Sequence, residues 1–431
     1  MKILIAGTTG ESMPPPYGGV PKASLLYARE WIQRLNERVG IAFVFAPPNP
    51  DDLGAGADYF FEFDSQPNKL SKIWFLLRHS LAHPILYLRI INAYFRVHPV
   101  LVKDIFLYAA YGIWIDQLLL RYKPDVLLLE SALIKGVVAA FVASWRKIPI
   151  VTDSYAEICD EHMGVNAYLT FEQKKTYWTK VLSMSEYVLG ISNCSIGALH
   201  YLPKEKVKVF YDTCDFTLCR SEIPFTQTKL RQQFQLAEHR FLVGAVGAFE
   251  YRKGHHHLIQ AAALAIKKGL DIGVVICGGS GDPEKWRKLA TEFGIQDRLS
   301  IFEKLPEQEL VKILHCLDVY ANLSNTHRSC GLDLALLEGM ASSIPVIVYK
   351  NGGLPEAVSE GKNGWIVNTD DIPGVAKVLV DAYALSPEQR REMGAESSRI
   401  ASKYDIRFTS VIKHDWLREA VSNYTSRQKS A

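Results

Sequence analysis

The chain has 431 residues, which is too many for one ordinary hydrophobic core and favours two domains of about 200 residues each. Hydrophobic residues make up 48% of it and charged residues 22%, a balance that excludes an intrinsically disordered protein. The formal net charge of +3 excludes a strong overall attraction to polyanions. No basic stripe accompanies a nucleic-acid reader motif, so we expect no nucleic-acid partner.

The seven cysteines are scattered, odd in number and without the spacing of metal ligands. This pattern favours free thiols in a reducing compartment and no bound metal ion. The N-terminal sequence "MKILIAGTTG" opens directly into a strand and shows no secretory signal. Every stretch of about 18 residues contains a charge, so we expect no transmembrane helix. Together these features predict a cytoplasmic protein.

Short apolar runs alternate with helical patterns along most of the chain. Such runs are typical of buried parallel strands, and stretches between them, such as 22–37, are amphipathic. The first series of expected strands covers residues 2–7, 41–46, 125–130, 149–153 and 187–192. The second covers residues 241–247, 271–279, 298–304, 318–324, 345–349 and 364–368. Two series of alternating strands and helices predict an α/β protein with two facing Rossmann-like, doubly wound parallel-sheet domains.

The expected domain boundaries follow from these series. We assign residues 1–215 to an N-terminal Rossmann-like domain and 216–404 to a C-terminal Rossmann-like domain, because the segment 212–229 between the two series lacks periodicity. Residues 405–431 are expected to form a C-terminal helix that packs back toward the first domain. Open α/β sheets bind ligands at the carboxyl ends of their strands, and helix N-termini favour phosphate. We therefore expect a cleft suited to a phosphorylated ligand and a second substrate.

Three motifs carry a family resemblance. They are "PPPYGGVPKASLLYARE" (14–30), "VGAFEYRKGHHHLIQAAA" (246–263) and "CGLDLALLEGMASSIPVIVYKNGGLPEAVSEGKNGWIVNTDD" (330–371). They resemble the glycine loop, the basic loop with its helix opening, and the signature region of the retaining glycosyltransferases of family 4. The resemblance is strong from about 240 to 370 and weaker before 215. It implies a GT-B fold in which residues 1–215 form the acceptor domain and residues 216–404 form the donor domain. The donor substrate would be a nucleotide-diphosphate sugar, with no cofactor or metal.

The resemblance also implies roles for particular residues. Lys253, with Arg252 beside it, would neutralise the diphosphate as the sugar leaves. Glu338 would bind the ribose hydroxyls, since a carboxylate accepts hydrogen bonds from a diol. Gly18 and Gly19 would let backbone N–H groups approach the phosphates. Further positions expected in the donor pocket are Leu305, Gly331, Leu332, Asp333 and Glu356.

Four positions depart from the family pattern. Cys330 stands in place of a glutamate, Ala248 of an arginine, Tyr155 of an acceptor-side histidine and Asp333 of a glycine. We keep Cys330 and Tyr155 as candidate catalytic residues, although Cys330 equally suits a small buried position. Tyr155 is a poor base at neutral pH but can orient a sugar. Asp333 is a good N-cap, yet it brings negative charge near a negative ligand. Arg252 lies close enough in sequence to replace the arginine lost at Ala248.

Two further groups of residues have two interpretations each. His327 and Arg328 either replace the missing carboxylate and arginine or belong to a solvated loop. The run "HHH" at 255–257 looks like a metal-binding tract, but consecutive residues on a helix point in different directions. We therefore expect this run on a helix surface.

The segment 65–123 carries eight Lys or Arg residues against two acidic ones, Asp104 and Asp116, with ten aromatic residues among them. This composition suits an interfacial amphipathic element on an anionic membrane, at the inner face of the cell membrane. The alternative is a set of ordinary helices with their aromatic residues in the core.

The favoured function is a retaining transferase that moves a hexose from a nucleotide sugar to a glycan or lipid-linked acceptor. By resemblance, the leaving diphosphate itself assists the acceptor hydroxyl. The departures at 330, 248 and 155 keep two rivals open. One is an inactive homologue that binds or stabilises an active transferase. The other is an enzyme of related nucleotide-dependent chemistry.

Overall fold

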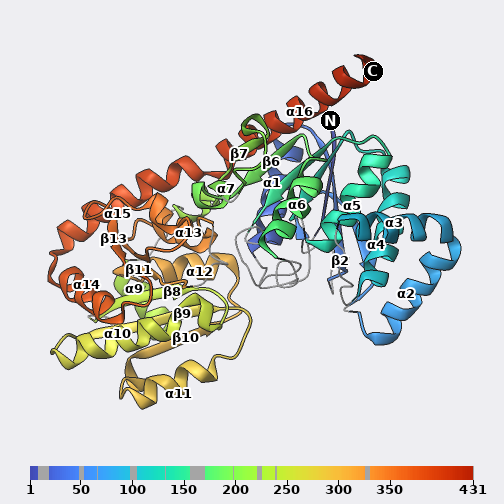
Figure 1. The fold of residues 1–431 in the computed structure, drawn as a ribbon. Helices are drawn as coiled ribbons and strands as arrows, with labels where there is room; N and C mark the ends of the chain where they lie inside the picture. The colour runs from blue at the N-terminus through green and yellow to red at the C-terminus, as the bar shows by residue number, and fades with distance from the viewer. Residues whose placement is uncertain are drawn as a thin grey trace. The chain divides into compact units, whose positions relative to one another are not determined.

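The computed structural model describes residues 1–7, 19–47, 53–65, 67–97, 104–131, 133–155, 170–197, 199–220, 226–237, 240–325 and 331–430. The chain divides into two compact units. Among the described residues, the first unit comprises those up to 210 and those from 410 onward, and the second comprises 211–409. Each unit is built around one parallel sheet with helices packed against it (Figure 1).

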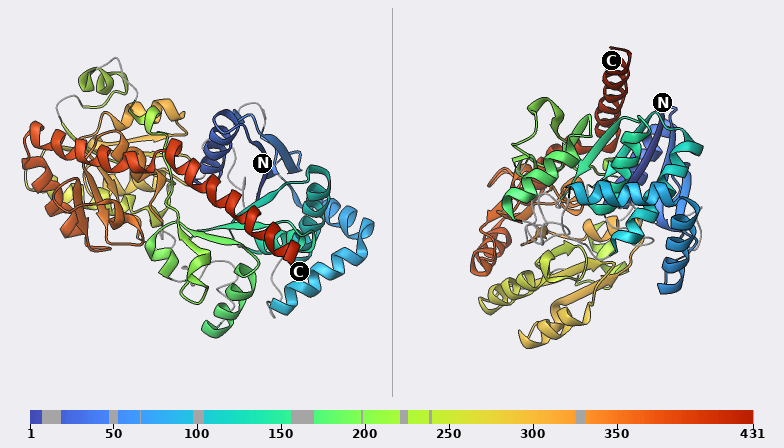
Figure 2. Two further views of the ribbon diagram at one scale, coloured as in Figure 1. Left: turned by 90° about the horizontal axis from the view of Figure 1, so that it is seen from above. Right: turned by 45° about the vertical axis from the view of Figure 1, so that its right-hand side comes forward.

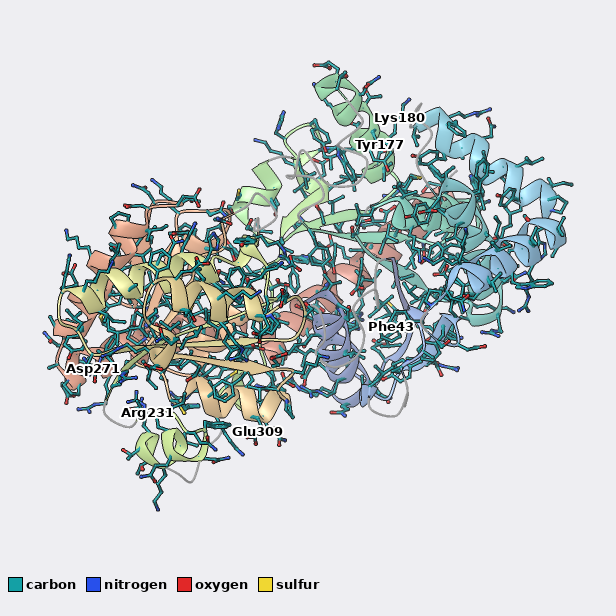
Figure 3. All side chains as sticks on the ribbon, turned by 90° about the horizontal axis from the view of Figure 1, so that it is seen from below. Phe43, Tyr177, Lys180, Arg231, Asp271 and Glu309 are labelled. Atoms are coloured by element: carbon teal, nitrogen blue, oxygen red, sulfur yellow. The ribbon has the colours of Figure 1, made fainter. Side chains whose placement is uncertain are left out.

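The first sheet contains seven strands in the part of the chain that the structure describes, ordered β3-β2-β1-β4-β5-β6-β7. They are β1 (Lys2–Gly7), β2 (Arg38–Phe45), β3 (Asp58–Phe63), β4 (Val126–Glu130), β5 (Ile150–Ser154), β6 (Tyr187–Gly190) and β7 (Val207–Val209). β4, β5 and β6 are buried along their whole length, as expected of strands covered on both faces. On β2, buried Phe43 (labelled in Figure 3) stacks on Phe61 of β3.

Helices cover this sheet and supply most of its core. They are α1 (Gly19–Gln33), α2 (Lys69–Ala82), α3 (Pro84–Val97), α4 (Ile105–Tyr122), α5 (Ile134–Trp145), α6 (Phe171–Leu182) and α7 (Asn193–Gly197), with a 3₁₀ turn, η4, at Lys204–Lys206. The long helix α16 (Ile406–Ser430), continuous in Figure 2, packs on this unit from Ser410 onward. The buried Trp31 donates its indole N–H to the Ser410 carbonyl at 2.8 Å, and Lys413 pairs with Asp153 of β5.

The second sheet has the order β10-β9-β8-β11-β12-β13. Its strands are β8 (Phe241–Val246), β9 (Ile272–Gly278), β10 (Leu299–Glu303), β11 (Val319–Asn322), β12 (Val346–Tyr349) and β13 (Gly364–Val367). Its helices are α8 (Phe216–Cys219), α9 (Gln227–Gln233), α10 (His255–Lys267), α11 (Glu284–Glu292), α12 (Glu307–Leu314), α13 (Leu334–Ala341), α14 (Ile372–Ala384) and α15 (Pro387–Ala401). Short 3₁₀ turns lie at η5 (Tyr251–Lys253), η6 (Gln296–Arg298), η7 (Leu354–Ala357) and η8 (Ser402–Tyr404).

Alternate residues of each strand serve two cores on opposite faces of the second sheet. On β9, Val274 packs into the cluster that includes α10 and α14, whereas Val275 packs into the cluster that includes α12 and α13. Such alternation follows from the two-residue period of a strand. The strand order is that of a Rossmann fold. In each sheet the chain first adds strands on one side of the first strand and then continues on its other side.

The predicted fold class, α/β with two doubly wound parallel sheets, is confirmed. Every strand expected from an apolar run is present, with ends shifted by a few residues. The sequence analysis missed β3 and β7. β7 is only partly buried, and β3 is partly buried over its first four residues, so neither presents a continuous apolar run.

Candidate functional site

The candidate site lies in the second unit, at the point where the strand order reverses. β8 and β11 are neighbours in the sheet, but the chain continues from β8 to β9 on one side and from β11 to β12 on the other. In open α/β sheets, ligands bind in this crevice at the carboxyl ends of the strands. Segments distant in sequence meet there: Lys253 and Asp333 are 80 residues apart and form an ion pair.

Two glycines bring Lys253 to this position. Lys253 ends the 3₁₀ turn η5, directly before α10. Gly254 follows with a φ of 71°, and a Cβ there would lie 2.0 Å from the Leu323 carbonyl oxygen. A Cβ at Gly247 would lie 3.1 Å from the Cγ and Cδ atoms of Lys253. Glycine at these two positions therefore allows the lysine and the start of α10 to approach the ends of β8 and β11 closely.

Asp333 caps a helix and also pairs with Lys253. It is the N-cap of α13, and its Oδ1 accepts from the backbone N–H of Ala335 at 3.2 Å. Its Oδ2 accepts from Lys253 Nζ at 2.6 Å. Burial would raise the pKa of Asp333, but the charge and hydrogen bond of Lys253 hold that pKa below its usual value. The negative charge near the expected phosphate position is thus neutralised within the chain.

Glu338 lies on α13 and is only 6% exposed. Beneath the helix, the ring of Tyr320 on β11 lies so near that a Cβ at Gly339 would be 2.8 Å from it. Burial raises the pKa of Tyr320, and the negative charges of Asp333 and Glu338 raise it further. The sequence analysis missed Tyr320. Its central place in an apolar strand made it look like an ordinary core residue.

The expectation that residues 255–257 lie on a helix surface is wrong for two of the three histidines. His255 and His257 are buried on α10. His255 Nε2 is 3.1 Å from the Ala248 carbonyl oxygen, and His257 Nδ1 is 2.9 Å from the Tyr349 hydroxyl. Burial lowers the pKa of His255 to about 4, so its neutral ring donates the Nε2 proton to Ala248. Among the described residues, no group of three or more His, Cys, Asp or Glu side chains is placed to hold a metal ion.

The other expected donor-pocket residues fall at several strand ends. Glu356 lies on η7 after β12, where it accepts a hydrogen bond from the Tyr211 hydroxyl at 2.8 Å. Leu332, just before the Asp333 cap, is fully buried in the core, and Gly331 is partly exposed. Leu305 follows the edge strand β10 and packs against the same core, two strands away from β8. The structure therefore joins Lys253 to the start of α13, and Leu305 packs against the core cluster to which Leu332 belongs.

The remaining expected site residues are Arg252 in the second unit and Tyr155 and Gly19 in the first. Arg252 forms an ion pair with Glu250, and its carbonyl accepts from the Asn325 N–H at 3.1 Å. Tyr155 follows β5 at the carboxyl edge of the first sheet and is partly exposed. A Cβ at Gly19, the first residue of α1, would meet no atom of the described residues within 4 Å. Gly18, Cys330, His327 and Arg328 lie outside the described residues.

Two buried ion pairs of the first unit escaped the sequence analysis. Lys135 Nζ of α5 donates to Glu62 of β3 at 2.7 Å, and Lys413 of α16 donates to Asp153 of β5. All four side chains are at least nine-tenths buried. No sequence pattern links positions so far apart, so only the fold reveals these pairs.

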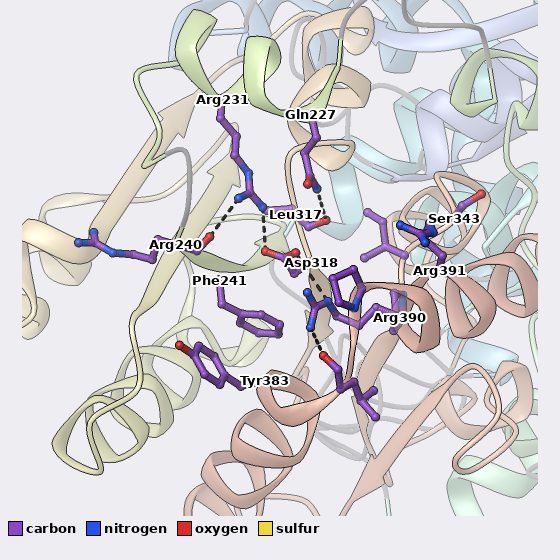
Figure 4. Close-up of a pocket in the computed structure, with 14 residues that line it drawn as sticks. Gln227, Arg231, Arg240, Phe241, Leu317, Asp318, Ser343, Tyr383, Arg390 and Arg391 are labelled. Carbon is purple, nitrogen blue, oxygen red and sulfur yellow. Dashed lines mark hydrogen bonds and ion pairs between the residues drawn. The ribbon is translucent and has the colours of Figure 1, made fainter.

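A cavity of about 630 Å³ in the second unit lies away from the candidate site (Figure 4). Its lining includes Phe241, which begins β8, and Asp318, which precedes β11, so it opens at the amino ends of the strands. Arg231, also labelled in Figure 3, reaches into it and binds Asp318 at 2.7 Å. Asp318 in turn accepts from the Leu242 N–H at 2.8 Å. These contacts tie α9 to the sheet, which is a structural role.

The comparisons with known proteins concern mainly the second unit. Residues 226–399 match the family model "Glycosyl transferases group 1". A D-inositol 3-phosphate glycosyltransferase of Corynebacterium urealyticum is 36% identical over 170 residues, which are 38% of this chain and 39% of that protein. A GDP-mannose-dependent alpha-(1-6)-phosphatidylinositol monomannoside mannosyltransferase of Mycolicibacterium smegmatis is 28% identical over 40% of this chain and 45% of its own length. The chain thus spans less than half of the length of these two relatives.

Solved structures resemble the chain over nearly its whole length. A glycosyltransferase from Rickettsia africae has a TM-score of 0.72 at 14% identity, covering 98% of this chain and 99% of its own. The Anabaena protein HepE, solved with UDP-glucose, has a TM-score of 0.70 at 19% identity and covers 98% of this chain and 100% of its own. These likenesses show the fold. The chain has the GT-B fold, and its residues 226–399 match the group 1 glycosyl transferases.

Proposed function

We propose that the chain is a retaining glycosyltransferase that moves a hexose from a nucleotide-diphosphate sugar to a glycan or lipid-linked acceptor. The observation that carries this proposal is the placement of Lys253. Two glycines hold it at the switch point of a sheet within the segment that matches the group 1 glycosyl transferases. The relative named for GDP-mannose and the neighbour solved with UDP-glucose support a nucleotide-sugar donor.

In this proposal, Lys253 stabilises the leaving diphosphate. The leaving group gains negative charge in the transition state, and a cation fixed near it lowers the barrier. Arg252 is paired with Glu250 in a partly exposed ion pair, which costs little to exchange for a phosphate contact. No metal or cofactor is required, because the two cations supply the positive charge. The leaving diphosphate assists the acceptor hydroxyl, so the sugar keeps its configuration.

Glu338 binds the ribose of the donor in this proposal. A buried carboxylate on α13 accepts hydrogen bonds from two neighbouring hydroxyls without a change in the fold. Gly19 supports the phosphate side, because packing within the described chain leaves space where a side chain would stand. Glu356, Gly331 and Leu305 shape the pocket through the turns in which they lie. Tyr155, at the end of β5, orients the acceptor sugar.

One contact favours the rival function, an inactive homologue that stabilises an active transferase. Asp333 occupies Lys253 at 2.6 Å, so a donor must compete with a carboxylate of the chain itself. The pair is partly exposed, however, with side chains 17% and 19% accessible. Exchange of Asp333 for another anion keeps Lys253 paired, so it avoids the cost of leaving a buried charge without a partner. A diphosphate, which carries more charge than one carboxylate, can therefore displace Asp333.

The first experiment is calorimetric titration with UDP, GDP, ADP, dTDP and CMP. We expect selective micromolar binding of one nucleotide. Glu338→Ala should abolish it, whereas Glu292→Ala, an exposed glutamate on α11, should not. The anomeric configuration of a product, read by NMR, tests retention separately. If no nucleotide bound, the donor site would be inactive and the rival function would stand.

The location of the protein is part of the same proposal. We propose that it works in the cytoplasm, peripheral to the inner face of the cell membrane, where nucleotide sugars and lipid-linked acceptors meet. No helix among the described residues combines the length and the hydropathy needed to cross a membrane. The support for membrane contact lies in the composition of residues 65–123.

A further inference from the structure

The helices α2 and α3 present apolar side chains to solvent. On α2, the exposed large apolar residues are Leu70, Ile73, Trp74, Leu77 and Leu81. Trp74 is 72% exposed and Leu81 75% exposed. On α3, Ile85 and Leu88 continue the pattern, with Ile85 84% exposed. A surface helix of a globular domain normally turns its apolar residues inward, so the exposed apolar residues of these two helices depart from the usual pattern.

The exposed residues of α2 form one stripe. At 3.6 residues per turn, positions 70, 73, 74, 77 and 81 fall on the same face of the helix. The opposite face carries the buried residues Phe75 and His79. Phe75 packs on Phe63 of β3, with ring centroids 5.0 Å apart, and burial lowers the pKa of His79 to about 4. The fold therefore already uses one face of α2, and the apolar stripe is left over.

The hairpin of α2 and α3 is held firmly by its unit. Asn68 caps α2 by accepting from the Ser71 N–H at 2.8 Å. His83, between the two helices, lies 2.8 Å from Gln117 of α4. The Tyr87 hydroxyl of α3 donates to the Phe106 carbonyl at 3.2 Å. Both helices also pack on α4, and the views of Figure 1 and Figure 2 place α2 at the edge of its unit. A rigid apolar stripe at an edge is suited to docking.

The positive charge of the hairpin indicates which kind of partner the apolar stripe binds. Residues 65–103 contain no aspartate or glutamate. The described hairpin carries the basic residues Lys69, Lys72, Arg78, Arg89 and Arg96. By the same helical geometry, Lys69 and Arg78 flank the α2 stripe on either side. Protein-binding surfaces are depleted in lysine, whereas a basic rim around an apolar stripe matches anionic headgroups around acyl chains.

We propose that the α2–α3 hairpin docks on an anionic lipid bilayer, with the stripe of Trp74 and Leu81 at the boundary of the acyl chains. α4 takes no part, because it is largely buried against α5 and the sheet. The region of membrane contact is therefore narrower than residues 65–123. The proposal locates a possible lipid-linked acceptor but does not depend on transfer, because vesicle binding is measured without donor or acceptor.

The test is flotation of the full chain with vesicles of phosphatidylcholine alone and of phosphatidylcholine with phosphatidylglycerol. We expect binding only to the anionic vesicles, weakened by salt. The double variant Trp74→Ser/Leu81→Ser should bind about tenfold less tightly, because it removes two apolar side chains from the membrane boundary. The matched variant Leu264→Ser/Phe408→Ser removes exposed apolar residues of the second unit and should bind as wild type does. Lys69→Gln/Arg78→Gln should remove the preference for anionic lipid.

Three results would overturn the proposal. The first is wild-type protein that stays with neither kind of vesicle. The second is equal binding of the Trp74→Ser/Leu81→Ser variant and wild type. The third is a change of oligomeric state in place of vesicle binding. Light scattering would then show a dimer for the wild type and a monomer for this variant, which would mean that a second copy of the chain covers the stripe. All substituted side chains are exposed, so the variants should melt as wild type does.

Discussion

Each unit holds a lysine–aspartate ion pair at the carboxyl edge of its sheet, and the two pairs differ in burial. Lys253 and Asp333 in the second unit are 17% and 19% exposed, whereas Lys413 and Asp153 in the first are 3% and 5% exposed. The pKa of Asp333 is lowered, but that of Asp153 is raised because burial outweighs the charge of Lys413. The same chemical pair thus keeps some access to solvent in the second unit and is almost fully buried in the first.

The largest expected effect concerns the buried pair. Lys413→Ala should destabilise the first unit by about 3 kcal/mol or more, because Asp153 is left buried without its charge partner. The change also removes the contacts of the Lys413 ammonium with the rings of Tyr27 and Phe210. Urea denaturation followed by tryptophan fluorescence measures the loss. In the double variant Lys413→Met/Asp153→Leu, most of the stability should return, and its failure to return would assign the effect to packing.

The less buried pair, Lys253 and Asp333, should respond mainly in activity. Lys253→Ala is expected to lower the rate of sugar transfer roughly 10²–10³-fold, as loss of one fixed positive group at a developing charge does. The melting temperature should fall less than in Lys413→Ala, because Asp333 keeps some access to water and its hydrogen bond with the Ala335 N–H. Lys267→Ala, which removes an exposed lysine from α10, the helix that follows Lys253, serves as the control. An unchanged transfer rate in Lys253→Ala would remove Lys253 from the proposed chemistry.

A smaller effect should follow from freeing Lys253. Asp333→Asn keeps a good N-cap for α13 but removes the competing charge. We expect the nucleoside diphosphate to bind about fivefold more tightly, since the competing ion pair is worth about 1 kcal/mol. Calorimetry compares the nucleotide affinity of wild type, Asp333→Asn and Asp333→Ala. Both variants remove the charge, but only Asp333→Ala also removes the N-cap, so their difference measures the effect of the cap. Weaker binding in Asp333→Asn would show that the carboxylate takes part in donor binding.

The smallest effect is a difference in pH dependence. The lowered pKa of Asp333 contributes stability above the ordinary aspartate pKa of about 3.9, and this stability is lost as the pH falls through the lowered value. The raised pKa of Asp153 has the opposite sign: its ionised form is penalised in the fold, so acidification through that pKa adds stability. The Asp153 effect falls above about pH 3.9 and the Asp333 effect below it, so unfolding of Asp333→Asn and Asp153→Asn from neutral pH to about pH 2 should deviate from wild type in opposite directions.

The outward stripe of α2 shows where prediction from sequence stops. Its periodicity and basic composition are visible in the sequence, and both interpretations of residues 65–123 used them. Periodicity defines a face but not its direction. The contacts of Phe75 and His79 with the rest of the unit decided that the apolar stripe faces solvent. The same reason explains the error at His255 and His257, which the helix turns inward.

The sequence alone determined the two parallel sheets, because apolar runs between amphipathic stretches have few other ways to be buried. The motifs also singled out Lys253 and Glu338. The tertiary structure alone decided the partners: Asp333 for Lys253, Tyr320 near Glu338, and Lys413 for Asp153, 260 residues away in sequence. Strands form from local patterns, whereas ion pairs and burial depend on the order in which distant strands join a sheet.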